Sequence, residues 1–131
     1  MVNGSAIRNR DQKAQLVDFG GLRWGKIMPT DIDAMIDFGN KLFVFIEAKY
    51  GGAKPSFGQR LALERVCDAV HSPENKRYAV AFLCAHSSNG DIDLSETIIT
   101  EVRWFGKWHK PKSEGVTLKT GIDTFKLKVA A

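Results

Sequence analysis

Hydrophobic residues in this chain gather in short, densely apolar runs that are separated by polar, glycine-containing breaks. The runs at 42–50 (LFVFIEAKY) and 77–86 (RYAVAFLCAH) are almost continuously apolar. Such runs are typical of strands that are covered on both faces of a sheet. Between them, residues 55–71 carry apolar positions at helical spacing, which predicts an amphipathic helix.

The whole pattern predicts an α/β fold. The expected order is helix, strand, strand, strand, helix, strand, strand, helix. These elements cover residues 8–19, 22–28, 30–38, 42–50, 55–71, 77–86, 96–104 and 117–129. A strand meander followed by a helix and further strands indicates a mixed central sheet flanked by helices. We therefore expect an αβββαβ core, followed by a last strand and a last helix that Gly121 weakens.

Length and charge placement predict one domain with a basic end. At 131 residues the chain can bury a core of its own. Residues 1–100 hold 12 basic and 12 acidic residues, whereas residues 101–131 hold seven basic and three acidic residues. The formal charge of +4 therefore lies in the last quarter, which is a mild signal for a polyanionic partner. We expect a single domain over 1–131, with a core at about 26–90 and a basic C-terminal extension at about 101–131.

Composition predicts a protein that works inside a cell. The chain has no run of about 18 apolar residues, and its polar start lacks the apolar core of a signal peptide. Cys67 and Cys84 lie in apolar surroundings without CxxC spacing, which is typical of unpaired thiols in a reducing compartment. The histidines are too scattered to indicate a zinc site. We expect a cytoplasmic protein that does not associate with a membrane.

The strands expected at 30–38 and 42–50 form a hairpin whose register can be predicted. A three-residue loop at 39–41, containing a glycine, places Phe38 opposite Leu42. Residue numbers that face each other then sum to 80. A two-residue loop would shift the register and turn the side chains of one strand to the other face.

In this register, acidic and basic residues meet on one face of an otherwise apolar hairpin. Asp33 lies opposite Glu47, and Asp31 lies opposite Lys49. Two convergent carboxylates form a hard oxygen site that suits Mg²⁺, which polarises a phosphate and favours hydroxide. The lysine can orient the water or offset charge on the transition state. The alternative is a solvated charged edge, against which the apolar density of LFVFI argues.

The spacing of these residues resembles that of the PD-(D/E)XK nuclease superfamily, the restriction-endonuclease-like phosphodiesterases. The motif is Asp33, 13 intervening residues, and then Glu47-Ala48-Lys49. It is most similar to the recombination-exonuclease and Holliday-junction-resolvase branches. The resemblance implies that Asp33, Glu47 and the backbone carbonyl of Ala48 hold Mg²⁺ or Mn²⁺, and that Lys49 acts on the attacking water. Asp31 competes with Asp33 for the first ligand position.

A glutamine on the following helix fits the same resemblance. The recombination branch often carries one there, and Gln59 lies on the apolar stripe that faces the sheet, which makes it a fourth candidate catalytic residue. The alternative is structural, because Ser56 and Gln59 fit a helix-capping box. The family often places a glutamate on its first helix, whereas this chain has none before Glu47. Asp11 or Asp18 could substitute.

Basic and aromatic residues interleave at 103–112 (RWFGKWHKPK), a pattern that can bind a nucleic-acid backbone and stack bases. The candidate nucleic-acid-binding residues are Lys54, Arg60, Arg103, Lys107, Trp108 and Lys110. The alternatives are a hairpin whose tryptophans pack on the core, and helix residues Arg60 and Arg65 that pair with Glu64 and Asp68.

The favoured hypothesis is a small Mg²⁺- or Mn²⁺-dependent deoxyribonuclease that hydrolyses DNA phosphodiester bonds without a covalent enzyme intermediate. Its size favours a structure-directed enzyme of phage or mobile-element type that processes DNA in recombination. A homodimer that cuts four-way junctions is a specific version of this hypothesis. Two others remain open. One is a catalytically silent nucleic-acid-binding module on the same fold, and the other is a non-enzymatic interaction protein.

Overall fold

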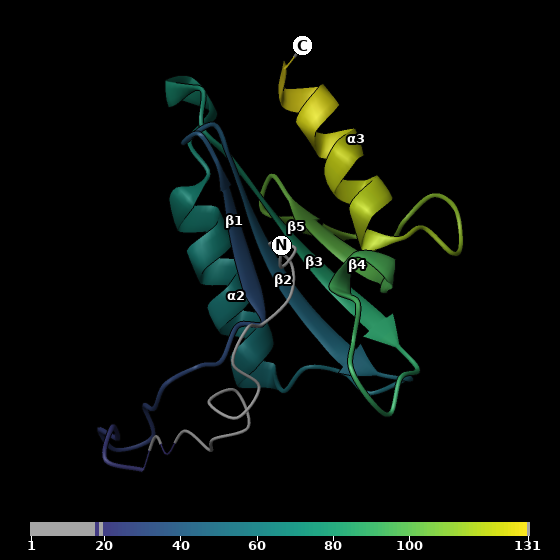
Figure 1. Ribbon diagram of the computed structural model, residues 1–131. Helices are drawn as coiled ribbons and strands as arrows, with labels where there is room; N and C mark the ends of the chain where they lie inside the picture. Colours follow the sequence, from purple (N-terminus) through teal and green to yellow (C-terminus); the bar gives the residue numbers. More distant parts are fainter. Residues whose placement is uncertain (1–17, 19, 131) are drawn as a thin grey trace, which may run out of the picture.

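A five-stranded mixed sheet with a helix on each face forms the part of the protein that the structure describes (Figure 1). The computed structural model describes residue 18 and residues 20–130. The strands are β1 (Ala34–Phe38), β2 (Leu42–Tyr50), β3 (Tyr78–His86), β4 (Ile98–Trp104) and β5 (Lys107–His109). The helices are α2 (Phe57–Val70) and α3 (Leu118–Ala130), with short 3-10 helices η1 (Pro73–Asn75) and η2 (Leu94–Glu96).

The strands lie in the sheet in the order of the chain, from β1 at one edge to β5 at the other. β2 and β3 are parallel because α2 connects them, and all other neighbours are antiparallel. The carboxyl ends of β2 and β3 therefore meet at the same end of the sheet. This end carries Glu47 and Lys49, on the last four residues of β2.

Side chains of β2 and β3 point alternately into two apolar cores. The core under α3 contains Leu42, Val44, Ile46, Val80, Phe82, Cys84, Ile99, Val102, Leu118 and Ile122. The core under α2 contains Phe45, Leu63, Cys67, Ala79, Ala81 and Leu83. Both strands are thus buried on both faces, which confirms the prediction made from their continuous apolar sequence. An α/β fold with a mixed sheet flanked by helices is likewise confirmed.

Several predicted elements have the expected place. The helix expected at 55–71 is α2, capped by Ser56 at its start and by His71 at its end. The last expected helix is α3, and the two cysteines are buried free thiols. Neither described helix is long and apolar enough to cross a membrane.

The predicted strand at 22–28 is wrong. Trp24 and Ile27 exchange backbone hydrogen bonds of 2.8 and 3.0 Å across Gly25 and Lys26, so the chain reverses there instead of extending. Gly25 has a φ of 65°, a left-handed conformation that ends a strand and that glycine adopts readily. The αβββαβ order is therefore not found among residues 20–130, where two strands instead of three precede α2. The helix expected at 8–19 lies outside the described residues, apart from Asp18.

Strand β5 was not predicted as a separate element. It spans only Lys107–His109 and carries too little apolar sequence to stand out. It pairs with β4, and a turn at Phe105 and Gly106 connects the two strands. Both turn residues have positive φ values, 49° for Phe105 and 74° for Gly106. The hairpin weighed as an alternative for residues 103–112 is therefore present. Residues 101–130 contain the second half of β4 and all of β5, which belong to the same sheet, and α3, which packs on its core.

Gly121 explains how α3 packs so closely on the sheet. It is buried in the first half of the helix, and a Cβ atom at this position would overlap Ile99 Cδ1 and lie 3.2 Å from Phe82 Cε1. The glycine that weakens the helix by intrinsic propensity is thus required by the contact between α3 and the sheet.

We predict that Gly121→Ala lowers the free energy of unfolding by about 1–2 kcal/mol, because overpacking outweighs the gain in helix propensity. Gly58→Ala is the matched control, since Gly58 lies in the first turn of α2 and a Cβ there meets nothing within 4 Å. We expect that control to raise the free energy of unfolding by up to about 1 kcal/mol. Urea denaturation measures both, and equal stabilisation by the two substitutions would contradict the packing argument.

Candidate functional site

The β1–β2 hairpin has the register that the sequence predicts. Phe38 pairs with Leu42 and Ala34 with Ile46, across a loop of residues 39–41. Gly39 and Asn40 in this loop both have left-handed backbones, with φ values of 61° and 62°. The Asn40 N–H donates to Asp37 Oδ1 at 2.7 Å, so this hairpin carboxylate stabilises the turn.

The same register brings Asp33 next to the carboxyl end of β2. The backbone ladder of β1 stops at Ala34, and Asp33 Oδ2 accepts a hydrogen bond of 2.7 Å from the Ala48 N–H. The carboxylate thus replaces the main-chain acceptor that a longer β1 would supply. Asp33 is exposed to solvent. Its position is therefore fixed by β2 and open to a ligand.

Glu47 is the buried member of the pair, with 5% of its surface exposed. Its pKa is raised from 4.5 to about 7, first by burial and then by the charge of Asp33 and a hydrogen bond with it. Lys49 opposes this shift and Asp31 adds to it. A buried carboxylate whose ionisation is opposed by burial and by a neighbouring carboxylate forms a site that a cation would stabilise.

Lys49 lies beside Glu47 on the same face of β2. Its Nζ is 3.8 Å from Glu47 Oε1, and its side chain is 29% exposed. The expected pairing of Asp31 with Lys49 falls beyond the end of the ladder at Ala34, and Asp31 instead lines a groove together with residues of α2. The structure therefore brings Asp33, Glu47 and Lys49 together, with Asp31 near enough to act on Glu47 through its charge.

Gln59 has the structural role that was weighed as the alternative. Ser56 Oγ accepts from the Gln59 N–H at 3.1 Å, and Gln59 Oε1 accepts from the Ser56 N–H at 3.2 Å. This capping box accounts for the glutamine without any part in chemistry. The Gln59 side chain also lines the groove of about 580 Å³ that contains Lys26, Asp31 and Arg65.

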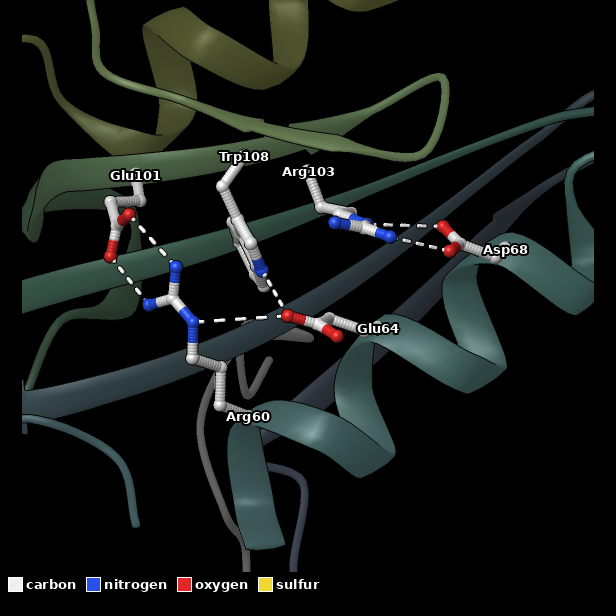
Figure 2. A network of polar contacts seen from close by, with 6 residues as sticks. All are labelled: Arg60, Glu64, Asp68, Glu101, Arg103 and Trp108. Atoms are coloured by element: carbon white, nitrogen blue, oxygen red, sulfur yellow. Dashed lines mark hydrogen bonds and ion pairs between the residues drawn. The ribbon is translucent and has the colours of Figure 1, made fainter. Parts of the chain in front are cut away.

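Two of the residues proposed to contact nucleic acid, Arg60 and Trp108, belong to a polar network between α2 and the β4–β5 hairpin (Figure 2). Arg60 donates to both oxygens of Glu101, at 2.7 and 3.0 Å, and its Nε lies 3.9 Å from Glu64 Oε1. The Trp108 Nε1–H donates to the same Glu64 oxygen at 2.6 Å. The guanidinium of Arg60 also lies 4.5 Å from the centroid of the Trp108 ring.

Arg103 completes this network on its other side. Its Nε and Nη2 donate to the two oxygens of Asp68 at 3.1 and 2.6 Å, and it lies 5.8 Å from the Trp108 ring (Figure 2). Hydrogen bonds to Glu101 and Asp68 raise the pKa values of Arg60 and Arg103 respectively. Arg60, Arg103 and Trp108 are therefore occupied within the protein. This use of Trp108 was missed, because nothing in the sequence pairs it with Glu64.

The three remaining nucleic-acid candidates are exposed lysines. Lys54 precedes α2, whereas Lys107 and Lys110 lie in and after β5. Lys54 and Lys110 are close enough to Glu101 to contribute to lowering its pKa, after the larger effect of Arg60. Their role in binding DNA stays a prediction.

Within residues 18 and 20–130, no three His, Cys, Asp or Glu side chains form a group that could hold a metal ion. The candidate site instead has the Asp33–Glu47 pair. The Ala48 N–H donates to Asp33. The role of the Ala48 carbonyl oxygen as a metal ligand stays a prediction.

No protein-family model, curated protein or solved structure gives a significant match to the chain.

We predict that Glu47 makes stability fall as the pH rises. Its pKa is about 7 in the folded protein and near 4.5 when unfolded, so the folded protein binds this proton more tightly. The contribution of Glu47 to the free energy of unfolding therefore decreases as the pH rises from about 4.5 to 7. Without divalent cations, Glu47→Gln should be about 1–3 kcal/mol more stable than the natural protein at pH 8, with little difference at pH 4.5.

Urea denaturation in EDTA at several pH values measures this difference. Asp37→Asn, on the exposed part of the same hairpin, controls for the loss of one carboxylate. A constant difference between the natural protein and Glu47→Gln across this range would show that Glu47 titrates normally.

Proposed function

We propose that the protein hydrolyses DNA phosphodiester bonds with the help of Mg²⁺ or Mn²⁺ at Asp33, Glu47 and Lys49. The observation that carries this proposal is the Asp33–Glu47 pair, in which a buried carboxylate has a pKa raised to about 7 by burial and by its neighbour. A buried carboxylate beside a second carboxylate is unfavourable unless it is protonated or paired with a cation. A lysine with its Nζ 3.8 Å from Glu47 adds a positive group on the same face.

The donor set fits a divalent cation of this kind. Mg²⁺ binds through one or two carboxylates, keeps several waters and takes further oxygens from phosphate, so it does not require a third acidic side chain. Asp33 is exposed and accepts through Oδ2 from the Ala48 N–H, and Asp31 is a further exposed carboxylate nearby. When bound, the cation would polarise a phosphate oxygen and lower the pKa of a water.

The protein's own groups would then position the reactants. Asp33 is fixed by its hydrogen bond to β2, and Glu47 is fixed by burial in the sheet. The ammonium of Lys49 would orient the attacking water and offset the negative charge that gathers on the phosphate. No side chain in this set is required to form a bond to the substrate.

The arrangement of elements supports a restriction-endonuclease-like fold as part of this proposal. An antiparallel hairpin carries the acids, α2 follows it, and the buried strand β3 then pairs in parallel with β2. The chain departs from the expected core at residues 22–28, which form a turn. Action on recombination intermediates, as an enzyme of phage or mobile-element type, belongs to the same proposal.

A catalytically silent DNA-binding module is the second candidate, and one observation favours it. Asp33 already accepts from the Ala48 N–H, and Glu47 already has Lys49 beside it. The three charged groups therefore partly satisfy one another within the protein. On this hypothesis the hairpin is structural, and lysines elsewhere bind DNA.

We predict metal-dependent cleavage of DNA that requires Asp33 and Lys49. Linear duplex, single-stranded, flap and four-way-junction substrates would be incubated with Mg²⁺ or Mn²⁺, and with EDTA as the blank. Asp33→Asn and Lys49→Ala should each reduce the rate by about 10²-fold or more, since each removes a charge that acts on the transition state. Asp37→Asn and Lys128→Ala are matched controls and should cut normally. Absence of cleavage of every substrate would reject the nuclease and leave the silent module.

We also predict that Mg²⁺ stabilises the protein through the acid pair. At about 100 times its dissociation constant, a cation that binds only the folded state adds about 2.7 kcal/mol. This corresponds to a rise of several degrees in melting temperature for a chain of this size. Thermal denaturation at pH 8 should show the rise for the natural protein and Asp37→Asn, but not for Asp33→Asn or Glu47→Gln. An equal rise in all four would place the cation elsewhere.

A further inference from the structure

A second charged feature lies at the other end of the sheet from the acid pair. A groove of about 550 Å³ opens between the β1–β2 loop, the start of β3 and the C-terminal end of α3, which lie at the same end of the sheet (Figure 1). Its lining residues are Phe38, Lys41, Leu42, Lys76, Tyr78, Lys126, Val129 and Ala130. The lining thus combines an apolar base with three lysines.

The three lysines come from three separate elements and are held in place by the fold. Lys41 ends the hairpin loop, and its carbonyl accepts from the Tyr78 N–H at 2.8 Å. Lys76 follows η1 with a left-handed backbone, its φ being 56°. Lys126 projects from α3, and its Nζ lies 4.8 Å from the centroid of the Phe38 ring. Folding therefore brings together positive groups that are far apart in the sequence.

Among the described residues, none of these three ammonium groups forms an ion pair with an acidic side chain. Among the described residues, the ion pairs of lysine are Lys49 with Glu47 and Lys119 with Asp123, and neither involves the groove. The carbonyl groups at the end of α3 supply only about half a negative charge. Three positive charges around one groove, without an ion pair among the described residues, favour an anionic ligand.

We infer that this groove binds the phosphodiester backbone of a DNA strand, at a site distinct from Asp33 and Glu47. Lysine binds phosphate as a point charge without reading bases. The groove is larger than one phosphate requires, and its charges are spread over three elements, which suits a chain of phosphates. The half-buried faces of Phe38 and Tyr78 add aromatic surface of the kind that single strands contact. This inference rests on the proposed function only for the choice of DNA as the polyanion.

The groove lies away from the acids in two respects. Lys41 precedes Glu47 by six residues of extended chain, or about 20 Å. Phe38, Leu42 and Tyr78 border the core under α3, whereas Glu47 shares its face with Phe45 under α2. Binding in the groove should therefore be independent of the metal and of the acid pair.

Fluorescence anisotropy of a labelled single-stranded oligonucleotide in EDTA tests this inference without cleavage. We expect the triple variant Lys41→Gln/Lys76→Gln/Lys126→Gln to bind at least 10-fold more weakly than the natural protein. Its plot of log affinity against log salt should also be shallower by about 2, since each phosphate contact to a single strand contributes about 0.7. Lys126→Gln and Lys128→Gln form a matched pair on the same helix, and only the first should weaken binding.

Two further measurements distinguish a failure of this inference from a failure of the proposed nuclease function. Binding is measured in EDTA, where metal-dependent cleavage does not occur, so that weak binding by the triple variant and absence of cleavage by the natural protein are distinct failures. Inorganic phosphate should compete only weakly, and equal competition per phosphate would show a small-anion site instead of a strand-binding groove. The inference is overturned if the natural protein does not bind the oligonucleotide. It is also overturned if the triple variant binds as tightly as Lys128→Gln.

Discussion

The antiparallel register between β1 and β2 is the constraint on which the candidate site depends. Gly39 and Asn40 set this register by adopting left-handed conformations, and Asp37 fixes the turn through its hydrogen bond to Asn40. A slip of one residue would move Asp33 to the opposite face from Glu47. The buried apolar side chains of β2 oppose such a slip, because it would mismatch the whole hairpin. The chemistry of the site is thus specified by the packing of residues that take no part in it.

The two faces of the sheet are held by different forces. The α3 face is almost entirely apolar and includes the close approach at Gly121. The α2 face adds the network around Trp108 to a smaller apolar core. Each of its partly exposed ion pairs contributes little stability on its own. The bidentate pairs Arg60–Glu101 and Arg103–Asp68 instead fix the orientation of α2 relative to β4 and β5.

Sequence patterns predicted the parts of this fold that depend on local and alternating preferences. Apolar periodicity predicted the buried strands and α2, and turn chemistry predicted the Ser56 cap. Turn chemistry also predicted the hairpin register, in which the numbers of paired residues sum to 80. The turn at Trp24–Ile27 was missed because LRWGKIM is apolar enough to resemble a strand, while the left-handed Gly25 reverses it.

The same limit applies to the candidate site. The approach of Asp33 to Glu47 was predictable, since it needs only one hairpin. The pairing of Arg60 with Glu101 and of Trp108 with Glu64 requires contacts between distant segments, which no local pattern contains. Arg60 and Trp108 were therefore assigned to nucleic acid when the fold uses them internally. The lysine groove was missed for the same reason, because its three charges come from distant parts of the chain.

Because β1 lies at the edge of the sheet, its acidic residues also affect how the protein associates with other molecules. An edge strand presents unpaired backbone groups that can recruit a strand from another molecule, and charged side chains on the edge oppose that association. Asp33 and Asp37 lie on this strand or directly before it, next to the exposed Met35. The carboxylates would thus protect the protein against aggregation as well as serving a ligand. Solubility and the candidate site therefore draw on the same charges, and a change that neutralises them affects both.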